Sequence, residues 1–237
     1  MKPTIRIVHA RTPDGQEMVL FQHDRDFGIR LGGQELMNSR RHESEQELAR
    51  LGCLHLAGQE SARVLVGGLG LGYTLRQALD VLGPRATVVV SELMPAVVEW
   101  NRVFLGALAG HPLQDRRVEL RMGDVVDLIR GSARAFDAIL LDIDNGPDAM
   151  TTSGNGRLYG REGIAACCGA LKERGCLAVW SAQPDKGYER NLMRAGMQVR
   201  LHRVPGHPGS KSASLFVWVA FKDQRPKMPK GPFQRGR

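Results

Sequence analysis

The chain has 237 residues, 42% hydrophobic and 24% charged, so it can bury the core of one α/β domain with a small attachment. No uninterrupted apolar run approaches the roughly 18 residues of a membrane helix, and the start alternates charged with apolar residues, unlike a signal peptide. These features predict a cytoplasmic protein with no membrane partner.

The formal net charge of +8 raises the question of nucleic-acid binding. Much of the excess lies in the last sixteen residues, which hold six Lys or Arg side chains against one Asp, together with three prolines. Residues 223–237 are therefore expected to form a basic disordered tail. Such a tail can bind RNA weakly or simply be solvated, and we favour the second interpretation.

The four cysteines, Cys53, Cys167, Cys168 and Cys176, show neither C-x-x-C spacing nor a pairing with histidines. Zinc sites usually need one of these patterns. We therefore expect reduced thiols in the core and no metal ion.

Residues 1–40 are expected to form a small antiparallel β unit, because short alternating apolar runs are separated by turn residues such as Pro13-Asp14-Gly15. The strands are expected at 4–8, 18–21, 27–30 and 35–37. Residues 41–60 form a second segment, a helix over 43–56 with a linker.

From Arg63 the chain alternates between strand and helix patterns, which is typical of a parallel sheet covered on both faces. Strands are expected near 63–67, 86–91, 117–121, 136–142 and 176–181, and helices near 72–82, 95–105, 124–130, 159–173 and 186–195. Two last strands, 198–204 and 214–222, have no room for a helix between them and must pair antiparallel. Residues 61–222 thus form a Rossmann-like α/β domain.

The loop after the first of these strands carries glycines at Gly67, Gly68, Gly70 and Gly72. Dinucleotide sites favour G-x-G-x-x-G, whereas this loop has the tighter G-x-G-x-G spacing. Glu92 follows at the tip of the next strand, where a carboxylate can accept hydrogen bonds from both ribose hydroxyls. The pattern indicates a nucleoside site, although a glycine-rich strand exit can also be a simple turn.

Acidic residues follow the other strands as well. Asp124 comes after the third strand, and Asp142 and Asp144 after the fourth. In open α/β sheets a ligand binds beyond the carboxyl ends of the strands. These side chains are therefore expected to surround one site.

The order and spacing of these motifs resemble the spermidine synthase family of polyamine aminopropyltransferases, which share the fold of class I methyltransferases. The resemblance covers nearly the whole chain to residue 222. It rests on the segments 64–75, 90–92, 123–124 and 139–142, and on Ser44-Glu45-Gln46-Glu47, which resembles the family's gatekeeping helix.

The resemblance implies aminopropyl transfer from decarboxylated S-adenosylmethionine to a small-molecule amine. Asp142, helped by Asp144, would accept the proton of the amine or orient it. The residues implied for the nucleoside are Gln46, Gly67, Gly68, Gly70, Gly72, Glu92 and Asp124. Each has a structural alternative: Asp124 can cap a helix, Gln46 can be solvated, and Asp142 and Asp144 can be turn formers.

Several positions depart from the family pattern. Gly70 stands where the family carries an aspartate that contacts the amine of the decarboxylated donor. Glu45 and His207 replace tyrosines, and Asn145 replaces a second aspartate. Glu45, Asn145 and His207 are thus the candidate acceptor-binding residues. The resemblance also implies a homodimer.

Two alternatives remain open. Intact S-adenosylmethionine carries its own carboxylate, so the missing acid at Gly70 favours a methyltransferase on the same fold. In the second alternative, the chain is a non-catalytic nucleoside- or RNA-binding protein that acts through its basic tail. Asp142 argues against the latter, because binding alone needs no carboxylate there.

Overall fold

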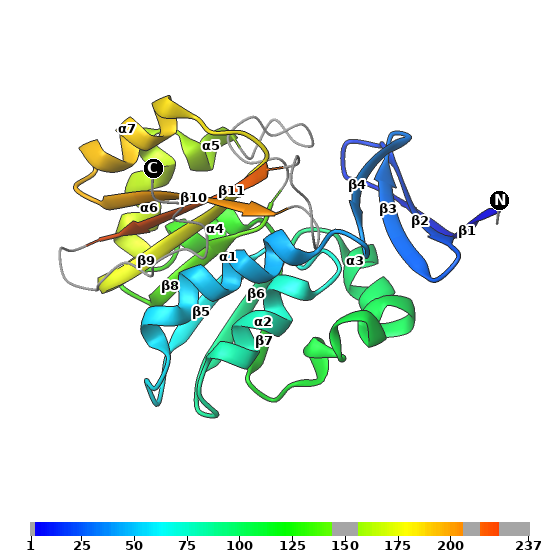
Figure 1. The fold of residues 1–237 in the computed structure, drawn as a ribbon, viewed down its shortest axis with the longest axis horizontal. Helices are drawn as coiled ribbons and strands as arrows, with labels where there is room; N and C mark the ends of the chain where they lie inside the picture. The colour runs from blue at the N-terminus through cyan, green and yellow to red at the C-terminus, as the bar shows by residue number, and fades with distance from the viewer. Residues whose placement is uncertain (1–2, 144–155, 206–213, 223–237) are drawn as a thin grey trace.

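The structure is a computed structural model that describes residues 3–143, 156–205 and 214–222. A small N-terminal sheet stands beside a larger body in which helices cover both faces of a second sheet (Figure 1). This mixed architecture, mostly parallel in the larger sheet, confirms the predicted fold class.

The N-terminal sheet is an antiparallel meander of four strands. The strands are β1 (Thr4–Arg11), β2 (Glu17–His23), β3 (Asp26–Leu31) and β4 (Gln34–Asn38). Alternation along β2 and β3 turns Leu20 and Ile29 inward, where both are fully buried and share one hydrophobic cluster with the larger body. The β unit is therefore packed onto the rest of the protein.

The larger sheet has seven strands in the order β10-β11-β9-β8-β5-β6-β7. Its strands are β5 (Arg63–Gly67), β6 (Thr87–Glu92), β7 (Val118–Met122), β8 (Phe136–Leu141), β9 (Leu171–Ser181), β10 (Gln198–Pro205) and β11 (Ser214–Phe221). Strands β5 to β9 run parallel, and β11 runs antiparallel to both β9 and β10. The predicted antiparallel end of the sheet is confirmed.

Successive side chains of the central strands point to opposite faces of the sheet. Val64 and Val66 of β5 face one hydrophobic cluster, and Leu65 between them faces the other. The first cluster includes residues of α1 (Glu43–Cys53), α2 (Tyr73–Val81) and α3 (Pro95–Trp100), and the second includes residues of α4 (Val125–Arg130), α5 (Gly156–Tyr159), α6 (Arg161–Ala170) and α7 (Lys186–Arg194). Burial on both faces explains the near-continuous apolar character of these strands.

Three predicted helix ends were wrong. The helix expected over 159–173 ends at Ala170, because Leu171 is fully buried and pairs with Phe136 as the first residue of β9. The helix expected over 95–105 is α-helical only to Trp100 and continues as a π-helical turn, Asn101–Leu105. The helix expected over 43–56 ends at Cys53, followed by the 3₁₀ turn Leu54–Leu56.

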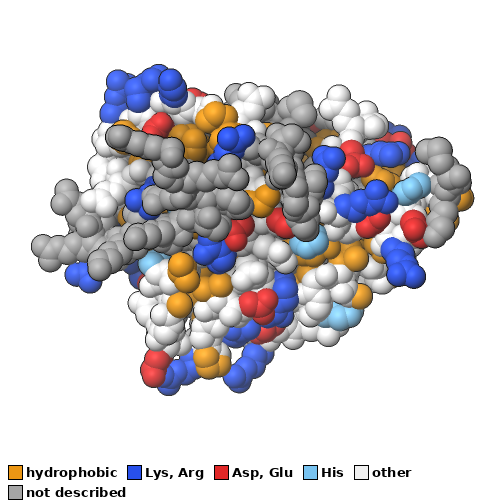
Figure 2. Space-filling model, viewed as in Figure 1, with side chains coloured by type: hydrophobic (Ala, Val, Ile, Leu, Met, Phe, Trp, Pro, Cys, Tyr) orange, Lys and Arg blue, Asp and Glu red, His pale blue; other side chains and the backbone are white. Residues whose placement is uncertain are grey.

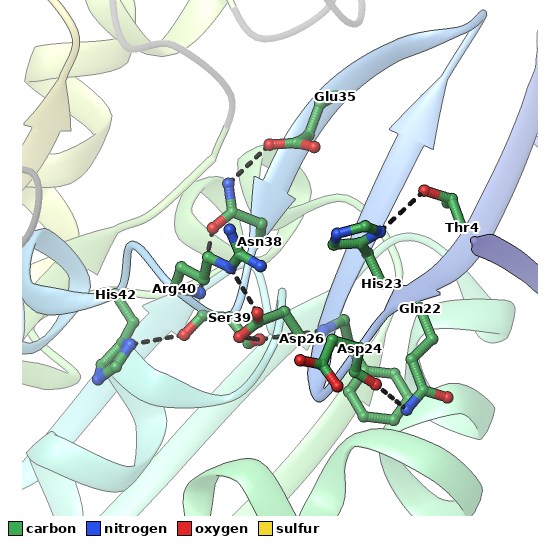
Figure 3. A network of polar contacts seen from close by, with 11 residues as sticks. Thr4, Gln22, His23, Asp24, Asp26, Glu35, Asn38, Ser39, Arg40 and His42 are labelled. Carbon is green, nitrogen blue, oxygen red and sulfur yellow. Dashed lines mark hydrogen bonds and ion pairs between the residues drawn. The ribbon is translucent and has the colours of Figure 1, made fainter. Parts of the chain in front are cut away.

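A polar network connects the β unit to the start of α1 (Figure 3). The Ser39 hydroxyl accepts a hydrogen bond from the Phe27 amide at 3.0 Å, and the Ser39 carbonyl accepts one from His42 Nδ1 at 2.9 Å. The His42 ring in turn stacks on Tyr73, the first residue of α2, with 4.2 Å between the ring centroids. The network therefore fixes how the β unit meets α1 and α2.

In the part of the chain that the structure describes, no helix is both long and apolar enough to cross a membrane.

Helix α1 can lie close to the large sheet because Gly52 faces it. A β-carbon at Gly52 would lie 2.3 Å from Leu140 Cδ2 and 2.9 Å from Ala178 Cβ, both in the buried core. We predict that Gly52→Ala lowers the free energy of unfolding by about 1–2 kcal/mol, because overpacking outweighs the gain in helix propensity.

Urea denaturation measures this change. Gly169→Ala in α6 is the matched control, because a β-carbon there meets no atom within 4 Å and Ala should be neutral or stabilising. Equal stability of the Gly52 variant and the wild type would contradict the packing of α1 described above.

Candidate nucleoside site

A cavity lies between the N-terminal β unit and the carboxyl ends of the central parallel strands. The larger body lines it with Gly68, Gly70, Ser91, Glu92, Leu93, Met94, Val97, Gly123, Asp124, Val125, Asp142 and Ile143. Five of the residues predicted from the sequence therefore meet at one cavity: Gly68, Gly70, Glu92, Asp124 and Asp142.

The glycine loop between β5 and α2 depends on backbone conformations that favour glycine. Gly68, Gly70 and Gly72 have φ angles of +88°, +51° and +89°. At Gly68 a β-carbon would also lie only 2.4 Å from the carbonyl oxygen of Asp142. The loop and the acidic end of β8 therefore touch through their backbones, and only glycine permits that contact.

The Glu92 carboxylate lies at the tip of β6 and organises the surrounding backbone. Its two oxygens accept hydrogen bonds from the amides of Leu69, at 2.9 Å, and Met94, at 2.7 Å. Glu92 is 7% exposed and lines the cavity. Each carboxylate oxygen has a second lone pair, so this geometry is compatible with the ribose contact expected from the sequence.

Asp124 occupies the position after β7, and its side chain caps α4. Asp124 Oδ1 accepts a hydrogen bond from the Val126 amide at 2.8 Å. The capping alternative considered from the sequence is thus confirmed, and Asp124 lines the cavity as well.

Asp142, the first residue after β8, is tied to α2 and through it to α1. The Thr74 hydroxyl donates a hydrogen bond to Asp142 Oδ2 and lies 3.4 Å from the Glu45 carbonyl. The Asp142 amide donates to the Gly67 carbonyl at 3.0 Å. One buried threonine therefore orients the carboxylate that the sequence singled out as the catalytic candidate.

Both acids at this corner hold their protons more tightly than usual. Burial raises the pKa of Asp142 to about 6, although the hydrogen bond from Thr74 opposes the shift. Burial and then the charge of Asp142 raise the pKa of Glu45 to about 8. The pKa values of both carboxyls therefore lie within about one unit of neutral pH.

The remaining predicted residues fall into three groups. Gln46 lies in the first turn of α1, where its backbone amide donates to the backbone carbonyl of His42 at 3.1 Å. Gly67 and Gly72 shape the loop without being among the described residues that line the cavity. Asp144, Asn145 and His207 lie outside the described residues, as does the tail 223–237.

One wall of the cavity comes from the N-terminal β unit, and this wall was not predicted from the sequence. The residues concerned are Thr12, Pro13, Met18, Leu31, Leu36 and Met37. Nothing in their local pattern distinguishes them from ordinary strand and turn residues, because their role depends on how the unit packs. Thr74 was not predicted for the same reason, although its place two residues after Gly72, in the first turn of α2, was a usable signal.

The charged groups of the surface give no concentrated basic patch on the described part of the face drawn in Figure 2. Lys and Arg side chains stand on separate parts of that face with Asp and Glu among them.

The described residues hold no group of three or more His, Cys, Asp or Glu side chains that could bind a metal ion.

Solved spermidine synthases share this architecture. The spermidine synthase from Thermotoga maritima superposes with a TM-score of 0.73 at 21% identity, covering 92% of this chain and 72% of that chain. A spermidine synthase in complex with the transition-state analogue AdoDATO gives a TM-score of 0.72, with the same identity and coverage. The fold is thus that of the spermidine synthases.

The sequence, in addition to the fold, identifies the protein family. Residues 46–196, more than half of the chain, match the family profile of the spermine/spermidine synthase domain. The chain belongs to this family, as the resemblance of its motifs predicted.

Two curated relatives are named polyamine aminopropyltransferase. That of Saccharolobus solfataricus is 28% identical over 126 residues, which are 53% of this chain and 40% of the relative. That of Thermococcus onnurineus is 32% identical over 100 residues, 41% of this chain and 35% of the relative. The matched segments thus span well under half of each relative's length.

The raised pKa of Glu45 predicts how stability depends on pH. Between the ordinary value of 4.5 and about 8, the folded state binds more protons at Glu45 than the unfolded state, so this group lowers stability as pH rises. Glu45→Gln should therefore gain stability relative to the wild type across this window, on the order of 1–3 kcal/mol.

Denaturant unfolding at a series of pH values measures the difference between the two proteins. Glu99→Gln is the control, because it removes an exposed carboxylate from α3. A difference that is flat from pH 4.5 to 8, or that falls, would show that Glu45 is not held in its protonated form.

Proposed function

We propose that this protein transfers an aminopropyl group from decarboxylated S-adenosylmethionine to a small amine. The observation that carries the proposal is the position of Asp142, a carboxylate with a raised pKa at the edge of the cavity, against the glycine loop. Family membership supplies the reaction class, and the names of the two curated relatives support it.

The chemical difficulty lies in the acceptor. An aliphatic amine has a pKa near 10, so nearly all of it is protonated and lacks the lone pair that must attack. A buried carboxylate stabilises the cation and orients it, and it can accept the proton as the amine reacts. We assign this role to Asp142, and Glu45 adds a second acid beside it.

Aminopropyl transfer replaces a C–S bond of the donor with a C–N bond to the acceptor. The nitrogen lone pair attacks the propyl carbon attached to sulfur, and a C–N bond forms while the C–S bond breaks. The bonding electrons return to the sulfonium, which leaves as the neutral thioether methylthioadenosine. Before the attack, the acceptor ammonium gives one proton to the Asp142 carboxylate, which passes it to solvent. The product is then a secondary ammonium, so charge and protons balance.

On the donor side we assign the ribose to Glu92, the adenine amino group to Asp124, and the remaining nucleoside contacts to Gly68 and Gly70. The first two carboxylates already line the cavity and are fixed by backbone hydrogen bonds. Preorganised acceptors cost little further ordering when a ligand binds. Asp144, Asn145 and His207 stay as proposed contacts to the acceptor.

A methyltransferase that uses intact S-adenosylmethionine is the second candidate, and one observation favours it. A β-carbon at Gly70 would have Met37 Sδ as its nearest neighbour, at 3.4 Å, so a thioether rather than an acid borders this part of the cavity. An aminopropyl donor ends in an ammonium group, for which an apolar neighbour is a poor partner.

Calorimetric titration with decarboxylated and with intact S-adenosylmethionine separates the two candidates. We predict tighter binding of the decarboxylated donor, because the Asp142 carboxylate, with a pKa of about 6, is mostly ionised at neutral pH and attracts a cation that carries no carboxylate of its own. Tighter binding of the intact donor would overturn aminopropyl transfer and support methyl transfer.

The role of Asp142 predicts the behaviour of Asp142→Asn. Turnover should fall by about 10²- to 10⁴-fold, the range expected for a lost acid–base group, while the Kd for methylthioadenosine stays near the wild-type value. Product formation measured by mass spectrometry, together with calorimetry, checks both parts.

Asp137→Asn is the matched control. Asp137 lies at the other end of the same strand, where its carboxylate binds the Arg63 amide and Lys172 Nζ, each at 2.7 Å. The control should lose some stability and keep its turnover. A fully active Asp142 variant would rule out the proposed role.

A further inference from the structure

Asn101 is a buried polar residue that none of the roles above explains. It is 3% exposed and lies where α3 ends and the π-helical turn Asn101–Leu105 begins. π-helical turns are rare and often occur at functional sites. The side chain reaches the glycine loop at Gly70, which lies 31 residues earlier in the sequence.

Two hydrogen bonds fix the orientation of the Asn101 amide. Asn101 Nδ2 donates to the carbonyl of Gly70 at 2.8 Å and to the carbonyl of Val97 at 2.9 Å. Because both partners can only accept, the atom that contacts them must be the NH₂ group. The side chain therefore joins the end of α3 directly to the middle of the glycine loop.

The other end of the amide lies against the start of α2. Asn101 Oδ1 is buried without a hydrogen-bond partner among the described residues and would lie 3.3 Å from a β-carbon at Gly72. A buried unpaired carbonyl costs free energy, so this side chain is not placed here for stability alone. It does fit between the two left-handed glycines, Gly70 and Gly72.

We propose that Asn101 is a positioning residue that holds the glycine loop in the conformation that receives the nucleoside. Its bond to Gly70 sets the plane of the Gly70–Leu71 peptide, so that the Leu71 amide is directed away from Asn101. Without this bond the flexible loop would sample other conformations, and ligand binding would have to restore the competent one.

This inference rests on the proposed function only for the ligand class, an adenosine thioether or sulfonium. The test uses methylthioadenosine as the probe and calorimetry as the readout. We expect Asn101→Leu, which keeps the size but not the donor, to raise the Kd by about 10- to 100-fold.

Arg117→Leu is the matched control at the opposite end of α2. Arg117 Nη1 donates to the carbonyls of Leu79, Leu82 and Gly83 at 2.9–3.3 Å, so it also clamps backbone through a side chain. Its loss should lower stability while the Kd for the probe stays within about 2-fold of wild type.

Asn101→Asp gives a readout that a merely structural role would not produce. A protonated Asp can still donate to the Gly70 carbonyl, whereas the ionised form repels both carbonyls. The Kd of this variant relative to wild type should therefore improve by about 10-fold or more from pH 8 to pH 5.5.

The measurements distinguish failure of the proposed function from failure of the positioning role of Asn101. If wild type does not bind methylthioadenosine, the proposed function fails. If wild type binds and the Asn101 variants bind equally well at every pH, the positioning role fails while the nucleoside site stands. If Asn101→Leu does not fold, the pH dependence of Asn101→Asp decides the question by itself.

Discussion

The contact between Gly68 and the backbone of Asp142 is the constraint on which the site depends. A β-carbon at Gly68 would lie 2.4 Å from the Asp142 carbonyl oxygen, so the glycine loop and the end of β8 can approach this closely only because Gly68 has no side chain. The parallel pairing of β5 with β8 brings the two segments together. The glycine loop and the acidic residue are thereby held at one edge of the sheet.

Around this contact, each polar side chain of the site also performs a structural task. Glu92 binds two backbone amides, Asp124 caps α4, and Asp142 accepts a hydrogen bond from Thr74. These bonds orient the carboxylates before any ligand arrives, which lowers the ordering cost of binding. Structural and functional explanations of these residues are therefore compatible.

The corner that holds Glu45 and Asp142 differs from the glycine-loop side of the cavity in its electrostatics. Burial raises both pKa values, and at Glu45 the charge of Asp142 raises the pKa further. In the proposed reaction, a cationic acceptor would offset the cost of ionising both carboxyls. The burial that destabilises the ionised carboxyls at neutral pH thus supports the proposal of a cationic acceptor.

The sequence by itself determined the order of the elements, the glycine loop and the acids at the strand ends, because apolar periodicity and glycine spacing are local properties. Only the tertiary structure decided that Leu171 begins a strand, that Met37 borders Gly70, and that Asn101 reaches the glycine loop. Each of these depends on packing between segments distant in sequence, which no local pattern encodes.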